Sequence, residues 1–135
     1  MKKRQQKISV VVPLYNEIGN LRQFHTQIVE SLESMPHDYE IIYVDDRSTD
    51  GTYEWLQKLK GGKGKKQITS KSEIVFRRHK SIKDGSDKVR VLQKQGKRGK
   101  AYSLVEGFVI ATGDVFVMID GDLQYPPSVI PQMIE

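Results

Sequence analysis

The chain has 135 residues, of which 22 are Lys or Arg and 17 are Asp or Glu, and it contains no cysteine. This length suits one small domain, and the 37% of hydrophobic residues can form a core, so the chain is not a disordered tail. The absence of cysteine excludes a disulfide framework, a cysteine-ligated zinc site and thiol catalysis.

The formal net charge of +5 combines two opposed parts of the sequence. Residues 57–100 contain 16 basic and three acidic residues, a net +13, whereas the rest contains six basic and 14 acidic residues, a net −8. A nucleic-acid-binding domain that is basic throughout does not have this distribution.

The N-terminus begins with basic residues followed by an apolar run, as a signal peptide does. Pro13 and Asn16-Glu17 interrupt this run, and no small-residue cleavage site follows. No segment approaches the roughly 20 apolar residues of a membrane-spanning helix. We therefore expect no targeting segment and no membrane-spanning segment. The expected location is the cytoplasm, either free or at the cytoplasmic face of a membrane.

Apolar, β-branched runs alternate with amphipathic segments along the chain. Strands are predicted at 8–12, 40–44, 89–92 and 115–119, with a further short strand at 74–76. Helices are predicted from after Asn16 to about Ser34, after the capping residues 48–50, from Gly99 to Ala111, and from Pro126-Pro127 onward. This alternation indicates an α/β fold, a Rossmann-like layer with a mostly parallel sheet and helices on both faces.

Polar and acidic clusters follow three of the predicted strands: Tyr15-Asn16-Glu17, Asp45-Asp46 and Asp120-Gly121-Asp122. In a parallel sheet they meet at one edge, where ligands bind near the reversal of strand order. An Asp-x-Asp step there can share a hard divalent ion, Mg²⁺ or Mn²⁺, with phosphate oxygens. Each cluster alone is also typical of a turn or helix cap, so their joint placement indicates a site.

Three ordered motifs resemble family 2 glycosyltransferases of the GT-A fold. They are residues 11–17, 44–52 and 113–127, and the last contains Asp-Leu-Gln-Tyr-Pro-Pro. This ending is most similar to the branch that makes polyprenyl- or dolichyl-phosphate mannose or glucose. The resemblance covers nearly the whole chain except about 60–88. We therefore interpret residues 1–135 as the N-terminal part of a GT-A domain with a basic inserted loop at about 60–88.

The resemblance implies a role for each matching residue. Pro13, Tyr15, Asn16 and Glu17 match the loop that lines the nucleotide base and ribose, and Asp45, with Asp46 beside it, matches the acid that hydrogen-bonds the base. Asp120 and Asp122 match the metal-binding Asp-x-Asp, and Gln124 matches a position near the donor sugar or its phosphates. Asp122 and Gln124 are the candidate catalytic residues. Gly99-Lys100-Ala101, preceded by Arg98, matches a helix start that suits an anionic donor.

The implied reaction is metal-dependent, inverting transfer of a hexose from UDP- or GDP-hexose to a polyprenyl or dolichyl phosphate. Mg²⁺ or Mn²⁺ can stabilise the charge on the leaving nucleotide, and a phosphate acceptor needs no strong general base. Two alternatives stay open. One is a transferase acting on a saccharide hydroxyl, and the other is a nucleotide-sugar-binding fragment without turnover, because the sequence ends inside the last predicted helix.

Two features depart from the family pattern. Arg47 stands where the family usually has Gly, and arginine rarely adopts a positive φ, so we expect either a different turn or an arginine that reaches a phosphate. The basic stretch Lys60–Lys100 is interpreted first as a solvated loop and second as a peripheral contact with anionic membrane. Nucleic-acid binding is disfavoured, because Phe76 is the only aromatic residue between Lys58 and Lys100.

Overall fold

The computed structural model describes residues 5–61 and 86–134. Within these residues four strands form one parallel sheet in the order β3-β2-β1-β4. The strands are β1 (Lys7–Leu14), β2 (Asp38–Asp45), β3 (Val89–Gln93) and β4 (Val115–Met118). The predicted α/β fold with a parallel sheet is confirmed, and the predicted strand at 74–76 lies outside the described residues.

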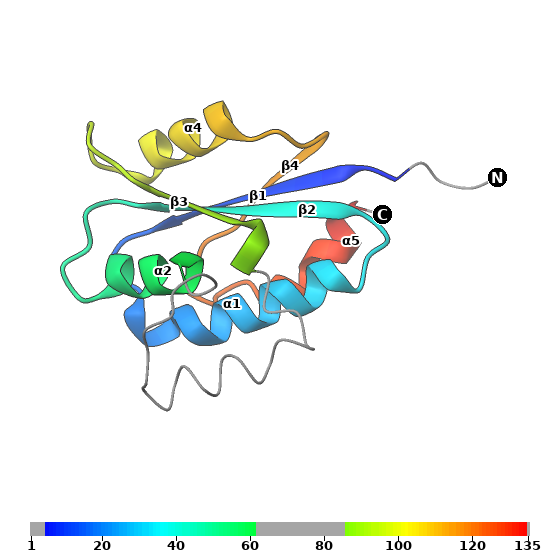
Figure 1. Ribbon diagram of the computed structural model, residues 1–135, viewed down its shortest axis with the longest axis horizontal. Coiled ribbons are helices and arrows are strands. Elements are labelled where there is room, and N and C mark those ends of the chain that lie inside the picture. The colour runs from blue at the N-terminus through cyan, green and yellow to red at the C-terminus, as the bar shows by residue number, and fades with distance from the viewer. Residues whose placement is uncertain (1–4, 62–85, 135) are drawn as a thin grey trace.

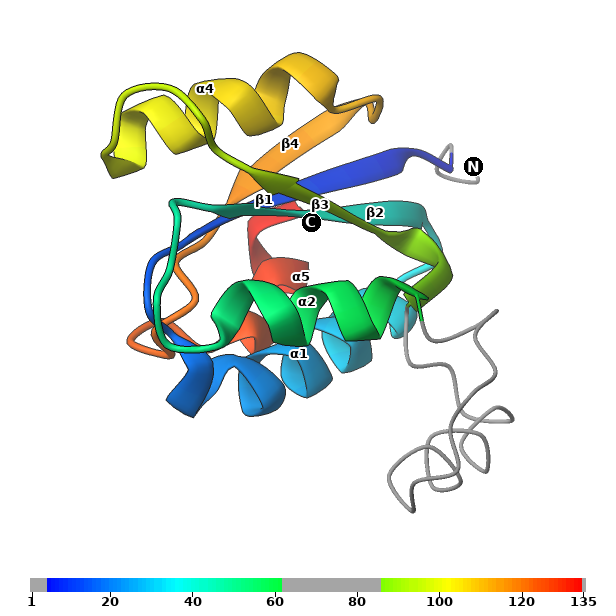
Figure 2. The same cartoon turned by 60° about the vertical axis from the view of Figure 1, so that its left-hand side comes forward.

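Helices cover both faces of this sheet. They are α1 (Ile18–Glu33), α2 (Thr52–Gly61), α4 (Lys100–Ile110) and α5 (Ile130–Ile134), with 3₁₀ turns η2 (Ser86–Lys88) and η3 (Pro127–Val129). Figures 1 and 2 show α1, α2 and α5 on one face and α4 on the other. The predicted helices are confirmed, although the last begins as a 3₁₀ turn. Among the described helices, none combines the length and apolar character needed to cross a membrane.

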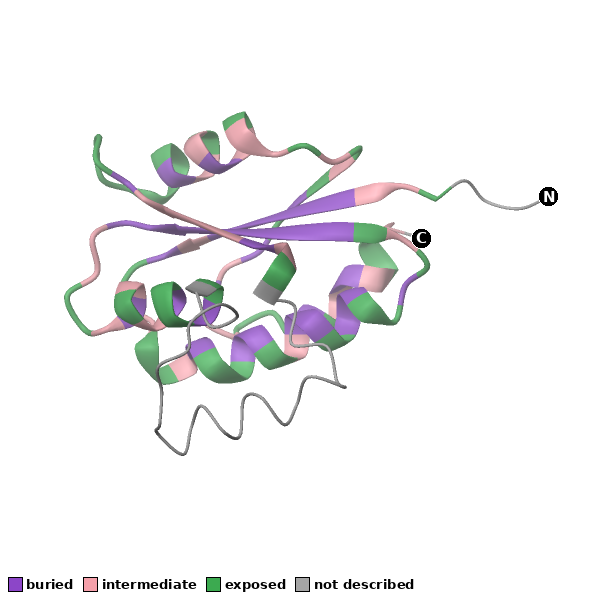
Figure 3. Cartoon of the chain, in the orientation of Figure 1, coloured by how far each residue is buried: buried purple, intermediate pink, exposed green. Residues whose placement is uncertain are grey.

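Alternation along the strands divides the core between the two faces. Val10 and Tyr43 belong to the larger cluster, which packs against α1 and α2, whereas Val11, Ile42 and Val44 belong to the cluster beneath α4. All five side chains are fully buried, and Figure 3 shows the central strands buried along most of their length. Because successive side chains of a strand point to opposite faces, the same alternation decides which way the residues after each strand point.

The direction in which successive strands are added to the sheet reverses at β1, between the pair β1-β2 and the pair β1-β4. After β2 and β3 are added on one side of β1, α4 crosses the sheet and β4 pairs with the other side of β1, where Val11 lies opposite Met118. Sheets of this kind bind ligands beyond the carboxyl ends of the strands at such a reversal. The fold therefore places a ligand site between the loops that follow β1 and β4.

Gly107 allows α4 to lie close against the sheet. It is buried, and a Cβ at this position would overlap the side chain of Val11 and lie 3.2 Å from Cγ2 of Val44. Contacts this short are not tolerated without movement of the helix or the strands. The absence of a side chain at Gly107 therefore sets the distance between α4 and the sheet.

The C-terminal end of α4 is fastened to the sheet by a buried carboxylate. Glu40 on β2 is 5% exposed and accepts hydrogen bonds from Ser9 Oγ at 2.6 Å, the Thr112 backbone N–H at 2.7 Å and Arg90 Nη1 at 3.2 Å. Burial raises the pKa of Glu40, but these hydrogen bonds outweigh burial and hold the pKa below its ordinary value.

Candidate functional site

An open pocket of about 170 Å³ lies at the carboxyl edge of the sheet. It is formed by the residues that follow β1, β2 and β4 together with the first turn of α4, so the three polar clusters predicted to meet at this edge do meet. The lining residues are Pro13, Leu14, Tyr15, Glu17, Asp46, Lys100, Ser103, Asp120, Gly121 and Asp122. Seven of the residues predicted for the site are among them, whereas Asn16, Asp45, Arg98 and Gln124 are not.

The loop after β1 is held in place by the loop after β2. Asn16 adopts the left-handed conformation, with φ at 52°. Its backbone N–H donates to Ser48 Oγ at 2.8 Å, and its Oδ1 accepts a hydrogen bond from the backbone N–H of Thr49 at 2.8 Å. Asn16 therefore joins the two loops, and its neighbours Tyr15 and Glu17 contribute to the pocket lining.

Asp50 fixes the start of two helices beside the pocket. Its Oδ2 accepts a hydrogen bond from the backbone N–H of Ile18 in α1, and its Oδ1 accepts one from that of Thr52 in α2. Thr52 Oγ1 in turn accepts from the backbone N–H of Glu17 at 3.0 Å. The predicted capping role of residues 48–50 is thus filled by Asp50, which also positions Glu17.

The two aspartates at the end of β2 have different surroundings. Asp45 is fully buried, and its carboxylate accepts from the backbone N–H and the hydroxyl of Ser48, at 3.0 and 2.6 Å. Asp46 lines the pocket. Strand alternation explains the difference, since Asp45 continues the row of Tyr43 toward α1 and α2, whereas Asp46 continues the row of Val44 toward α4.

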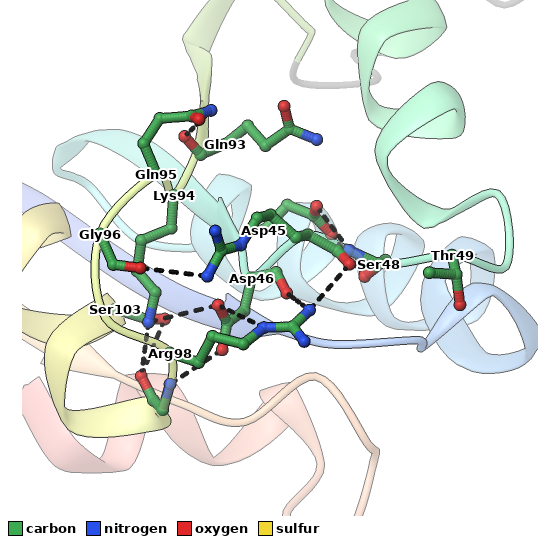
Figure 4. Close-up of polar contacts among 12 residues, drawn as sticks. Asp45, Asp46, Ser48, Thr49, Gln93, Lys94, Gln95, Gly96, Arg98 and Ser103 are labelled. Atoms are coloured by element: carbon green, nitrogen blue, oxygen red, sulfur yellow. Dashed lines mark hydrogen bonds and ion pairs between the residues drawn. The ribbon is translucent and has the colours of Figure 1, made fainter.

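Asp46 is surrounded by positive charge from the loop between β3 and α4 (Figure 4). The Nζ of Lys94, whose side chain is fully buried, lies 3.3 Å from Oδ1 of Asp46 and donates to the Gly99 carbonyl at 2.9 Å. Oδ2 of Asp46 accepts from the backbone N–H of Gly99 at 2.9 Å. Burial raises the pKa of Asp46, but the Gly99 hydrogen bond and the cations of Lys94 and Arg98 outweigh it and lower the pKa.

Arg47 and Arg98 connect the loop after β2 with the loop between β3 and α4. Each arginine donates hydrogen bonds to backbone carbonyls of the other loop. Arg47 has φ at 59°, so this arginine adopts the left-handed conformation that arginine rarely takes. Its Nη2 donates to the Gly96 carbonyl at 3.1 Å. Arg98 donates to the carbonyls of Asp46 and Arg47, at 3.0 and 3.2 Å, and its guanidinium lies 5.3 Å from the centroid of the Tyr15 ring. Arg98 is thus beside a pocket residue without being in the lining itself.

The loop after β4 carries the two carboxylates of the Asp-x-Asp motif. Lys100 Nζ lies 2.9 Å from Oδ1 of Asp120, and Oδ1 of Asp122 accepts from the backbone N–H of Gln124 at 3.1 Å. Between Asp122 and Gln124, Leu123 adopts a left-handed φ of 65°, which is costly for a leucine and typical of functional loops. Gln124 is exposed at the surface.

The donor set at this loop fits a hard divalent cation whose remaining ligands come from a substrate. Within residues 5–61 and 86–134, no three His, Asp or Glu side chains group as a metal site. Mg²⁺ and Mn²⁺ are commonly held by one or two carboxylates and complete their shell with water and substrate phosphate. Asp120 and Asp122 supply two such carboxylates in one pocket, and the contact of Asp120 with the Lys100 ammonium shows that it faces a cation.

Four residues of the site escaped prediction from the sequence. Leu14, Ser103 and Gly121 line the pocket, and Lys94 supports it from beneath. Ser103 stands three residues after Lys100, the spacing of one helical turn, which is a signal that could have revealed it. Gly121 lies against Leu14, and a Cβ there would overlap that side chain.

The parallel Rossmann-like layer of this chain is the fold of GT-A glycosyltransferases. The Glycosyl transferase family 2 profile matches residues 9–135, and the chain belongs to this family. It is 36% identical to a dolichol-phosphate mannosyltransferase of Pyrococcus furiosus, over 96% of this chain and 29% of that protein. It is 30% identical to an undecaprenyl-phosphate 4-deoxy-4-formamido-L-arabinose transferase of Aeromonas hydrophila, over 95% of this chain and 32% of that protein. The chain thus spans about a third of the length of these relatives.

Solved structures share the fold at lower identity. A mannosyltransferase of Pyrobaculum calidifontis in complex with GDP-Man and Mn²⁺ superposes with a TM-score of 0.54 and 24% identity, over 88% of this chain and 28% of that one. A glucosyl-3-phosphoglycerate synthase of Mycobacterium tuberculosis superposes with a TM-score of 0.60 and 23% identity, over 96% of this chain and 39% of that one. A complex of the same synthase contains Mn²⁺ and UDP.

Proposed function

We propose that this chain forms the donor-binding part of a glycosyltransferase that transfers a hexose from a nucleotide sugar to a polyprenyl phosphate, with inversion and with Mg²⁺ or Mn²⁺. The observation that carries this proposal is the pocket at the strand reversal, where Asp120, Asp122 and Lys100 lie together. Both relatives named above act on polyprenyl phosphates, which supports this class of acceptor.

Each part of the pocket suits one part of the donor. Pro13, Tyr15 and Glu17 form the side proposed to receive the base and ribose, and Asp46 is the carboxylate there that faces the pocket. Asp120 and Asp122 would hold the metal ion, which when bound supplies positive charge to the leaving diphosphate. Lys100 adds a cation beside that diphosphate, at the N-terminus of α4.

The chemistry of the acceptor follows from its charge. A lipid phosphate is already an anion, so no residue has to remove a proton from it before it attacks the sugar. In the same proposal Gln124, exposed beside Asp122, contacts the donor sugar. The lipid would also bring the reaction to a membrane surface, in line with the expected cytoplasmic face. The predicted membrane contact at Lys60–Lys100 falls largely on residues 62–85, outside the described part of the chain.

Donor binding is the direct test. Isothermal titration of GDP-mannose and UDP-glucose in the presence of Mn²⁺ should give binding to the wild type. Asp120→Ala and Asp122→Ala should each weaken this binding at least about tenfold, because each removes a charged ligand of the ion. Asp87→Ala, which removes an exposed aspartate in η2, is the matched control and should bind like the wild type. Equal affinity in all four proteins would contradict the metal site.

The acceptor and the stereochemistry need a second assay. The chain should transfer labelled hexose to undecaprenyl phosphate and not to a saccharide, and the anomeric configuration of the product, read by NMR, should be inverted relative to the donor. Transfer to the saccharide alone would favour the hydroxyl-acceptor alternative. Donor binding with no transfer to either acceptor would favour a nucleotide-sugar-binding fragment.

A further inference from the structure

Lys100 contacts the carboxylate that a metal ion in this pocket would need. Its Nζ lies 2.9 Å from Oδ1 of Asp120 and 3.1 Å from Oδ2. The two residues belong to different parts of the fold, since Lys100 is the first residue of α4 and Asp120 follows β4. The ammonium group thus donates to the same two oxygens whose lone pairs would bind a cation.

The contact has an electrostatic cause. Asp120 and Asp122 are separated by one residue, Gly121, and neighbouring carboxylates repel each other unless a positive charge lies close by. Lys100 supplies such a positive charge to Asp120. The side chains of Lys100 and Asp120 are 60% and 36% exposed, and ion pairs so open to solvent are weak. A divalent ion can therefore displace the ammonium, at some loss of metal affinity.

The displaced ammonium would have a new partner in the same pocket once a nucleotide diphosphate is present. Lysine is a point charge on a flexible four-carbon stem, so it can exchange a carboxylate for a phosphate without movement of the backbone. Lys100 lines the pocket beside Asp120 and Asp122, which brings the two anionic groups within the reach of one side chain.

We propose that Lys100 is an internal counter-ion of the Asp-x-Asp motif. It competes with the metal ion for Asp120 when no nucleotide is bound, and it moves to the diphosphate when metal and nucleotide bind together. The inference rests on the proposed function, since it requires donor and metal to share the pocket. By linkage, each ligand then raises the affinity for the other, and Lys100 contributes to that coupling.

Two titrations of the full chain test this proposal. Electron paramagnetic resonance of free Mn²⁺ measures the affinity for the metal alone, and calorimetry with GDP and UDP at saturating Mn²⁺ measures the affinity for the diphosphate. Lys100→Met should bind Mn²⁺ alone about two to five times more tightly than the wild type, because a weak competing ion pair is removed. The same variant should bind the diphosphate about tenfold more weakly, because a charged hydrogen bond is lost.

Controls separate this effect from a general change of charge. Lys97→Met removes an exposed cation from the same loop, outside the pocket lining, and should leave both affinities unchanged. Lys100→Arg keeps the cation and should bind Mn²⁺ alone like the wild type.

The outcomes also separate this inference from the proposed function. If the wild type binds Mn²⁺ and nucleotide but Lys100→Met gains no affinity for Mn²⁺, the counter-ion role alone is overturned. The same holds if Lys97→Met shows an equal gain. If the wild type binds neither Mn²⁺ nor nucleotide, both the metal site and the counter-ion role are overturned.

Discussion

Lys94 is a buried cation whose ammonium group contacts one carboxylate and one backbone carbonyl. Its ammonium lies between the carboxylate of Asp46 and the carbonyl of Gly99, and its backbone N–H donates to the Asp45 carbonyl at 2.7 Å. A lysine can be buried in this way only when a partner and hydrogen bonds replace the water that it loses. The side chain thus links the end of β2 to the loop that leads into α4.

Removal of this cation should destabilise the protein. Lys94→Met keeps the length and apolar stem of the side chain but leaves Asp46 largely buried, with Arg98 at 3.8 Å as its remaining ion-pair partner. Loss of one partner of a buried ion pair costs about 3 kcal/mol, so urea denaturation should show a fall of roughly that size in the free energy of unfolding. Lys94→Met/Asp46→Asn should recover part of the loss. A double variant no more stable than the single one would argue against the pairing.

For single residues, the sequence predicted which residue types form the site better than which residues each of them contacts. The sequence predicts a nucleotide contact for both Asp45 and Asp46. Neighbouring side chains of an extended chain point in opposite directions, so Asp46 faces the pocket and Asp45 does not. The side-chain oxygen of Asn16 accepts a hydrogen bond from Thr49, a residue 33 positions away, which the sequence does not reveal. Contacts of this kind depend on the packing of loops that no local pattern specifies.

At the scale of the elements, the close packing of α4 on the sheet depends on Gly107, which has no side chain. Gly107→Ala should improve helix propensity by about 1 kcal/mol, but the added methyl group would overlap Val11 beneath the helix. Overpacking of a tight contact costs about 1–3 kcal/mol, so we expect a net loss in the free energy of unfolding of up to about 2 kcal/mol. Thermal and urea unfolding measure this change.

The matched control is a glycine in α1. A Cβ on Gly19 would meet no atom within 4 Å, so Gly19→Ala should stabilise the protein by up to about 1 kcal/mol through helix propensity alone. If both alanine variants were stabilised equally, the close packing of α4 on the sheet would be disproved.

The elements themselves were largely predictable. Strands buried on both faces read as β-branched apolar runs, and the helices between them show an apolar side, so their positions agree with the structure within a few residues. The position of β4 was not predictable, because an apolar run does not reveal which strand edge it will join. That edge places Asp120 beside Lys100.

At the scale of the molecule, bases of the basic stretch pair with acids from the rest of the chain in the part that the structure describes. The five ion pairs found in the described parts of the chain each join a base in residues 88–100 to an acid outside that stretch. The bases are Lys88, Arg90, Lys94, Arg98 and Lys100, and the acids are Asp38, Glu40, Asp46 and Asp120. This part of the basic stretch therefore has partners within the protein, which composition alone could not show.

Acidification should therefore destabilise the fold. Folding lowers the pKa of Asp38, Glu40, Asp46 and Asp50 below the ordinary values of 3.8 for Asp and 4.5 for Glu. Since the folded protein holds these protons less tightly than the unfolded chain, the stabilisation is complete above the ordinary values and is lost as the pH falls through the lowered ones. The urea midpoint should fall between about pH 5 and about pH 3.

Glu40→Gln provides the comparison for this pH dependence. It should be less stable than the wild type near neutral pH by roughly 2 kcal/mol, since hydrogen bonds to a buried carboxylate are lost. It should also lose less stability on acidification, because one of the titrating groups has been removed. The same loss on acidification in both proteins would rule out a contribution from Glu40.

The reversal of strand order also has a consequence for the kinetics of folding. The pocket needs β4 beside β1, and Lys7 and Asp114, which are hydrogen-bonded at that junction, are 107 positions apart in the sequence. Pairing between such distant segments is slow, because the chain loses the entropy of a long loop before the stabilising contacts form. The first three strands can assemble without completing the pocket. Nucleotide binding at this pocket therefore requires that β4 is paired with β1, and a bound nucleotide should slow unfolding by holding β4 in place.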